Sequence, residues 1–122
     1  MRLFEFVKIN ESEEYFDDIA TSIVSAIPET LEIWFHGSRA RGDFHEEGDE
    51  DDEDGYYDTA SDWDILAILP TNYTETHNYI TAVKFCQNLS RKYNGFDIQV
   101  TLLNNNLAEI AADQGQLIWS KT

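Results

Sequence analysis

The chain has 122 residues, a length typical of one small domain, which buries roughly two-thirds of the surface of its unfolded chain. Its apolar content of 42% excludes an intrinsically disordered protein. Its net charge of −16 disfavours direct binding to nucleic acid or to an anionic membrane, and its single cysteine excludes an internal disulfide bond.

The first part of the chain predicts a strand, a helix and a second strand. Residues 2–9 are rich in Phe and Val, which favours a short strand. Asn10 begins a capping box, and apolar residues then recur at three- and four-residue steps as far as Pro28, which predicts an amphipathic helix. Residues 31–36 form a compact apolar strand, and a short helix is expected over residues 38–42, after a glycine turn.

An acidic segment follows at residues 43–60, without apolar periodicity. Residues 43–64 hold 12 of the 24 acidic residues and no Lys or Arg, so the rest of the chain has 12 acids against 8 bases, a net charge of −4. The acidity is therefore local, and we interpret residues 43–60 as an acidic loop inserted into the domain.

The second part of the chain begins with a buried strand. Residues 63–69 are a nearly continuous apolar run, typical of a strand covered on both faces, and Pro70 ends it. A helix is expected over residues 75–93, with Gly95 as its stop. The last predicted elements are a strand, a short helix and a strand at residues 96–103, 107–112 and 116–120. The pattern predicts a single α/β (α+β) domain over residues 1–122, with a small mixed sheet backed by two main helices.

The turn after the strand at residues 31–36 has the groups that a triphosphate needs. Gly37 lets the backbone approach phosphate oxygens without a side-chain clash. Ser38 offers a hydroxyl, and the helix that begins there supplies N–H donors and a favourable dipole. Arg39 or Arg41 could neutralise phosphate charge. These four residues are the predicted nucleotide-binding set.

Three aspartates are candidates for metal binding and catalysis. Asp62 and Asp64 lie two apart at the start of a strand, so their side chains share one face and can bind Mg²⁺ jointly with substrate phosphates. If the next strand is a neighbour, Asp97 completes a site for two Mg²⁺ ions, as a metal ligand or as a general base. Alternatively, Asp62 and Asp64 only solvate a strand edge, and Asp97 is a turn residue.

Gly37-Ser38, Asp62-Trp63-Asp64 and the later Asp97 resemble the hallmark of the DNA polymerase beta-type nucleotidyltransferase superfamily, which is a Gly-Ser turn, then Asp-x-Asp, then a further acid. The similarity covers residues 30–100. It is nearest to the minimal members, the MNT proteins, which often act as antitoxins beside HEPN toxins. The chain departs from the pattern in one respect, because 23 residues separate Ser38 from Asp62, whereas the family usually places the acids soon after the serine.

The resemblance implies an enzyme that uses ATP and Mg²⁺ to move AMP onto a hydroxyl, expected on a side chain of a HEPN-type toxin that it neutralises. Two alternatives stay open: a noncatalytic module that inhibits a basic partner through its acidic loop, and a transferase that acts on a small molecule such as an antibiotic.

No apolar run approaches the ~20 residues of a membrane span. Residues 3–8 are too short and too charged for a secretory signal, so we expect a cytoplasmic protein.

Overall fold

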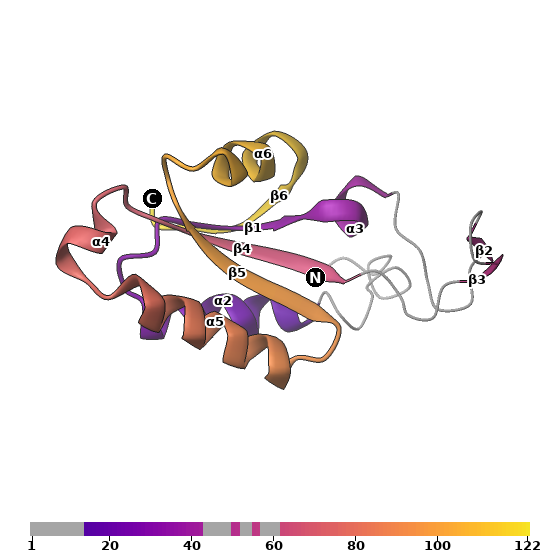
Figure 1. The fold of residues 1–122 in the computed structure, drawn as a ribbon, viewed down its shortest axis with the longest axis horizontal. Helices are drawn as coiled ribbons and strands as arrows, with labels where there is room; N and C mark the ends of the chain where they lie inside the picture. The colour runs from indigo at the N-terminus through magenta and orange to yellow at the C-terminus, as the bar shows by residue number, and fades with distance from the viewer. Residues whose placement is uncertain (1–13, 43–49, 52–54, 57–61) are drawn as a thin grey trace.

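The computed structural model of the chain describes residues 14–42, 50–51, 55–56 and 62–122. The strand predicted over residues 2–9 and the capping box at Asn10 lie outside these residues. Figure 1 shows the described part as a sheet with helices on both of its faces.

The sheet has four strands in the order β5-β4-β1-β6, and it combines parallel and antiparallel pairs, as predicted. β1 (Glu32–His36) runs antiparallel to both β4 (Trp63–Leu69) and β6 (Gln116–Ser120). β5 (Phe96–Leu102) runs parallel to β4 and forms one edge of the sheet. The short helix α3 (Gly37–Arg41) continues directly from β1, so it begins at the end of a central strand.

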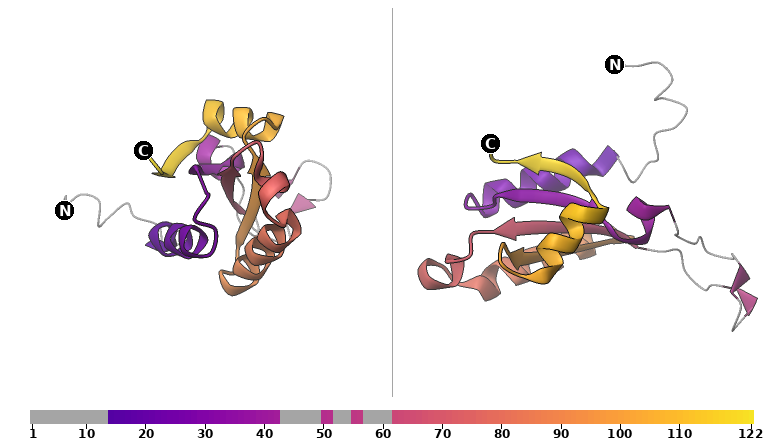
Figure 2. Two further views of the ribbon diagram at one scale, coloured as in Figure 1. Left: turned by 90° about the vertical axis from the view of Figure 1, so that its left-hand side faces the viewer. Right: turned by 90° about the horizontal axis from the view of Figure 1, so that it is seen from above.

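Helices cover both faces of this sheet (Figures 1 and 2). α2 (Phe16–Ala26) and α5 (Tyr79–Lys92) pack on one face and share the main apolar core. α6 (Asn106–Gln114) packs on the opposite face in a smaller apolar cluster. Every residue of β4 other than Asp64 is consequently buried, as its continuous apolar run predicts. Among the described residues, no helix combines the length and apolar content needed to cross a membrane.

The helix expected over residues 75–93 is divided into α4 (Tyr73–Thr76) and α5. The chain is extended at His77, and Asn78 then caps α5, because its Oδ1 accepts a hydrogen bond of 3.0 Å from the N–H of Ile80. An asparagine at this position satisfies an N–H group that the first turn of a helix leaves without a partner. Apolar residues on both sides of the break concealed it in the sequence pattern.

The acidic segment contains a short hairpin where the sequence predicted only a loop. β2 (Glu50–Asp51) pairs antiparallel with β3 (Gly55–Tyr56). Strands of two residues are too short to produce a periodic pattern, so side-chain alternation could not predict them. In Figures 1 and 2 this hairpin lies beyond α3, away from the main sheet. The remaining residues of the acidic segment lie outside the described part of the chain.

Candidate active site

The strand register brings the candidate acids together beside α3. Asp64 is the pairing partner of His36 on β1 and also of Asp97 on β5. Paired residues of adjacent strands have backbones about 5 Å apart and place their side chains on the same face. Asp62 stands two residues before Asp64 and therefore shares this face. The candidate residues thus converge at one end of the sheet, on the face that carries α6.

Gly37 lies against the carboxylate of Asp64. Its φ of 82° is in the left-handed region, which favours glycine. A Cβ at Gly37 would stand 2.9 Å from Asp64 Cγ and would overlap Oδ2. Ser38 follows in the first turn of α3, where its carbonyl accepts a hydrogen bond of 2.9 Å from the N–H of Gly42. Only a residue without a side chain allows the α3 turn and the Asp64 carboxylate to approach so closely.

Negative charge is crowded at Asp64. Burial, followed by the charges of Asp97 and Asp62, raises the pKa of Asp64 to about 6, and Arg41 opposes this increase. Burial also lowers the pKa of the neighbouring His36, which keeps its imidazole neutral at pH 7. A perturbed carboxylate with specific charged neighbours is typical of functional sites. The cluster is therefore suited to attract a cation.

The two arginines of α3 act on different surroundings. The guanidinium of Arg39 lies 4.9 Å from the ring centroid of Trp63, which is itself stacked on Phe35 at 5.4 Å. Trp63 faces the α2 and α5 side of the sheet, opposite to the acids. Arg41 is the arginine whose charge affects the pKa of Asp64. The structure therefore places Arg41 toward the acidic cluster and Arg39 toward the main core.

The aspartates do not form a ready-made metal cage. Within residues 14–42, 50–51, 55–56 and 62–122, no group of three or more His, Cys, Asp or Glu side chains is close enough to hold a metal ion. Mg²⁺ usually binds through one or two carboxylates together with substrate phosphates, and it does not require a cage made of protein alone. The oxygen donors of Asp62, Asp64 and Asp97 fit that mode, in which the nucleotide would complete the ligand set.

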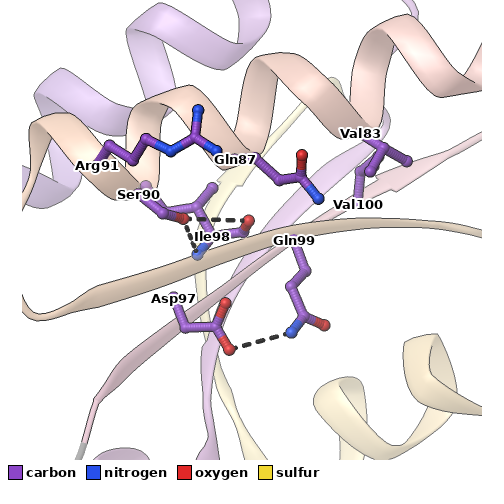
Figure 3. Close-up of a pocket in the computed structure, with 8 residues that line it drawn as sticks. All are labelled: Val83, Gln87, Ser90, Arg91, Asp97, Ile98, Gln99 and Val100. Carbon is purple, nitrogen blue, oxygen red and sulfur yellow. Dashed lines mark hydrogen bonds between the residues drawn. The ribbon is translucent and has the colours of Figure 1, made fainter.

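Asp97 also lines a groove beside the outer edge of β5 (Figure 3). Gln99 Nε2 donates a hydrogen bond of 3.0 Å to Asp97 Oδ2, which orients the carboxylate. We did not predict Gln99 from the sequence. Its place two residues after Asp97 in a strand puts both side chains on one face, and that spacing is the signal that could have identified it.

The chain matches no protein-family model and no curated protein. Solved structures do match it. The crystal structure of a toxin–antitoxin with AMP-PNP is 20% identical, with a TM-score of 0.58 over 88% of this chain and 74% of that chain. A MntA–HpeT toxin–antitoxin mutant with two aspartate-to-glutamate changes is 17% identical, with a TM-score of 0.55 over 88% of this chain and 74% of that chain. A candidate nucleotidyltransferase from Sulfolobus solfataricus is 21% identical, with a TM-score of 0.49 over 90% of this chain and 84% of that chain.

The two toxin–antitoxin structures define the fold of this chain. Its mixed four-stranded sheet, with helices on both faces, is the nucleotidyltransferase-like fold of the MNT type. This confirms the fold that the Gly-Ser and Asp-x-Asp resemblance implied.

Proposed function

We propose that the chain is a nucleotidyltransferase that moves AMP from ATP to a hydroxyl of a partner protein and so acts as the antitoxin of a HEPN-type toxin. The observation that carries this proposal is the contact of the Gly37 turn with Asp64, in register with Asp97. Further support comes from two structural neighbours that are toxin–antitoxins, one of them with AMP-PNP. A reaction that consumes ATP fits a cytoplasmic protein.

In this proposal the start of α3 binds the triphosphate. The N–H groups of the α3 turn and the Ser38 hydroxyl donate hydrogen bonds to phosphate oxygens. Arg41 neutralises phosphate charge, because its charge acts at the acidic cluster. Arg39 was predicted from the sequence as a second phosphate ligand. In this proposal Arg41 takes the phosphate role, and the position of Arg39 over Trp63 gives Arg39 the different role of holding α3 against β4.

Asp62, Asp64 and Asp97 would hold Mg²⁺, as one or two ions, together with the phosphates of ATP. Bound Mg²⁺ would supply positive charge where three carboxylates and a triphosphate meet, and it would polarise the phosphate oxygens. Burial, and after it the charges of Asp97 and Asp62, raise the pKa of Asp64, and the part that these charges contribute supports the assignment, because a bound cation would offset it.

The proposed transfer is a single displacement at the α-phosphorus of ATP. The oxygen of the acceptor hydroxyl bonds to the α-phosphorus, and its proton passes to the Asp97 carboxylate, which acts as the general base. The bond between the α-phosphorus and the oxygen that bridges to the β-phosphorus breaks. Pyrophosphate leaves with that oxygen, and AMP remains joined to the acceptor through a phosphodiester bond.

Labelled ATP tests this function directly. The whole chain is incubated with Mg²⁺, ATP labelled at the α-phosphorus, and a lysate or a candidate toxin encoded by the neighbouring reading frame. We expect transfer of label to one protein, and a loss of at least 100-fold with either Asp62→Asn or Asp64→Asn. Asp18→Asn is the matched control, because Asp18 is exposed on α2 at the opposite face of the sheet.

Full transfer by both site variants would exclude this active site. A different outcome would favour the noncatalytic alternative: the chain would bind and inhibit its partner, no label would be transferred, and the site variants would bind the partner as tightly as the wild type.

A further inference from the structure

The carboxylate of Asp97 has a hydrogen-bond partner on its own strand. Gln99 Nε2 donates a hydrogen bond of 3.0 Å to Asp97 Oδ2. Phe96, Ile98 and Val100 of β5 belong to the main core. Alternation along the strand therefore puts Asp97 and Gln99 on the opposite face, which carries α6. Figure 3 shows both side chains on the same side of β5, away from α5. The pair lies on the face of the sheet that holds the acidic cluster.

The backbone of β5 is held firmly on both sides of Gln99. The N–H of Ile98 donates a hydrogen bond of 2.8 Å to Ser90 Oγ, and the Tyr79 hydroxyl donates one of 2.8 Å to the carbonyl of Val100. Along its other edge, β5 pairs with β4 over its whole length. An edge strand that is tied to both a helix and a neighbouring strand gives its side chains a fixed direction.

The partner of Asp97 is neutral, although a cation lies in the same groove. Arg91 lines this groove, but its Nη1 donates a hydrogen bond of 2.9 Å to Asn88 Oδ1, and within the described residues it forms no ion pair with Asp97. A carboxamide donates a hydrogen bond without bringing a charge. It can therefore orient a carboxylate and leave the negative charge available, whereas a guanidinium would neutralise that charge.

This hydrogen bond gives the two oxygens of Asp97 different surroundings. The side-chain torsion that rotates an aspartate carboxylate is broad and roughly twofold when nothing restrains it. Because the N–H of Gln99 can only donate, Oδ2 must act as the acceptor and is already engaged. Oδ1 is the oxygen that this contact leaves for a cation.

We propose that Gln99 is a positioning residue for Asp97, because it fixes Oδ2 and presents Oδ1 to a divalent cation without neutralising the carboxylate. This inference rests on the proposed function, in which Asp97 helps to hold the cation beside the nucleotide. Loss of a group that is hydrogen-bonded to a metal ligand typically lowers metal affinity or activity roughly 10–100-fold. A comparable loss is expected here.

Binding of Mn²⁺ to the full chain tests this role without transfer of AMP. Mn²⁺ is added with α,β-methylene-ATP, which is not cleaved at the α-phosphorus, and free Mn²⁺ is measured by electron paramagnetic resonance. Gln99→Leu removes the donor and should raise the Kd of Mn²⁺ about tenfold. In an Asp97→Ala background the same substitution should change the Kd less than about twofold, because the residue through which Gln99 acts is missing.

Gln87→Leu is the matched control. Gln87 is also exposed and lines the same groove, but it belongs to α5 and lies on the other side of β5 (Figure 3). Gln87→Leu should leave the Kd of Mn²⁺ unchanged. All variants should unfold at the urea concentration that unfolds the wild type, since both glutamines are exposed.

NMR of the chain without metal or nucleotide gives an independent measurement. The side-chain amide protons of Gln99 should exchange with water more slowly than those of Gln87, because one of them is held by Asp97. Asp97→Ala should remove this difference.

The positioning role is overturned if the wild type binds no Mn²⁺, if Gln99→Leu binds Mn²⁺ as tightly as the wild type, or if its loss of affinity is equally large in the Asp97→Ala background. Equal exchange of the Gln99 and Gln87 amides would overturn it as well. Transfer of labelled AMP is scored separately. Coupling of Gln99 to Asp97 without any transfer would keep the positioning role and reject the proposed enzyme, whereas full transfer by Gln99→Leu would reject only the positioning role.

Discussion

Replacement of Gly37 by alanine tests the contact on which the site depends. Alanine in the left-handed region costs roughly 1–2 kcal/mol. Forcing its Cβ against the Asp64 carboxylate adds roughly 1–3 kcal/mol, as for other overpacked positions. We therefore expect Gly37→Ala to lower the free energy of unfolding at pH 7 by about 2–5 kcal/mol, a large part of the roughly 5–15 kcal/mol that stabilises a typical domain.

Gly42→Ala is the matched control for this substitution. Gly42 has a similar φ of 89°, but among the described residues no atom beyond its chain neighbours lies within 4 Å of a Cβ built there. Only the conformational cost of roughly 1–2 kcal/mol then applies. The difference between the two alanine variants, about 1–3 kcal/mol, measures packing against Asp64. Adding Asp64→Ala to Gly37→Ala should recover most of that difference, because it removes the atoms that the new Cβ meets.

Urea denaturation followed by circular dichroism gives the free energies of unfolding of Gly37→Ala, Gly42→Ala and the double variant relative to the wild type, provided that the slope of the transition is unchanged. Thermal unfolding gives a second measure, with a shift of about 4 °C per kcal/mol expected for a chain of this size. Equal destabilisation by Gly37→Ala and Gly42→Ala would refute the close approach of the turn to Asp64. A double variant that is less stable than Gly37→Ala would refute it as well.

Three further predictions concern charge and hydrogen bonding. Since the folded-state pKa of Asp64 is raised to about 6, the free energy of unfolding of the wild type should fall as the pH rises from about 4 toward 6. In urea denaturation, Asp64→Asn should be about 1 kcal/mol more stable than the wild type at pH 7.5, after allowance for solvent screening, and equally stable near pH 4. A stability difference that does not change with pH would contradict this prediction. Arg41→Ala should raise the Kd for Mg–ATP about tenfold in calorimetry. Arg39→Ala should leave that Kd unchanged and lower the free energy of unfolding by about 0.5–1 kcal/mol. Equal effects of the two substitutions on Kd would contradict the placement of the two side chains. Ser90→Ala should cost about 1–2 kcal/mol and speed amide exchange at Ile98, whose N–H loses its 2.8 Å acceptor, and unchanged exchange would contradict that role.

Local sequence signals predicted much of the fold. The buried strand β4 matches its predicted limits, because a continuous apolar run is bounded by Asp62 and Pro70. The limits of β6 also match the prediction. The break at Asn78 was not predicted, since apolar periodicity continues across it and the capping hydrogen bond is a local detail. Two main helices were expected behind the sheet, but whether α6 would cover the opposite face depended on tertiary packing.

The candidate site was predictable in its residues and not in its geometry. Gly37, Asp64 and Asp97 were chosen by residue type and spacing, and the strand order that makes them neighbours comes from pairing across the sheet. The sequence could not decide between Arg39 and Arg41, because residues two apart on a helix face different directions and the helix orientation was unknown. The groove beside β5 requires α5 and β5 to be side by side, which no local pattern encodes.

Because His36 pairs with Asp64, the segment that connects β1 to β4 can change in length without moving the site. β1 and β4 hold both ends of this stretch through main-chain hydrogen bonds, so its length does not determine where the carboxylates stand. Each doubling of a flexible connection adds only about 0.6 kcal/mol of closure entropy. The interval between Gly42 and Asp62 is consequently a natural place to graft an epitope or a reporter peptide into this fold.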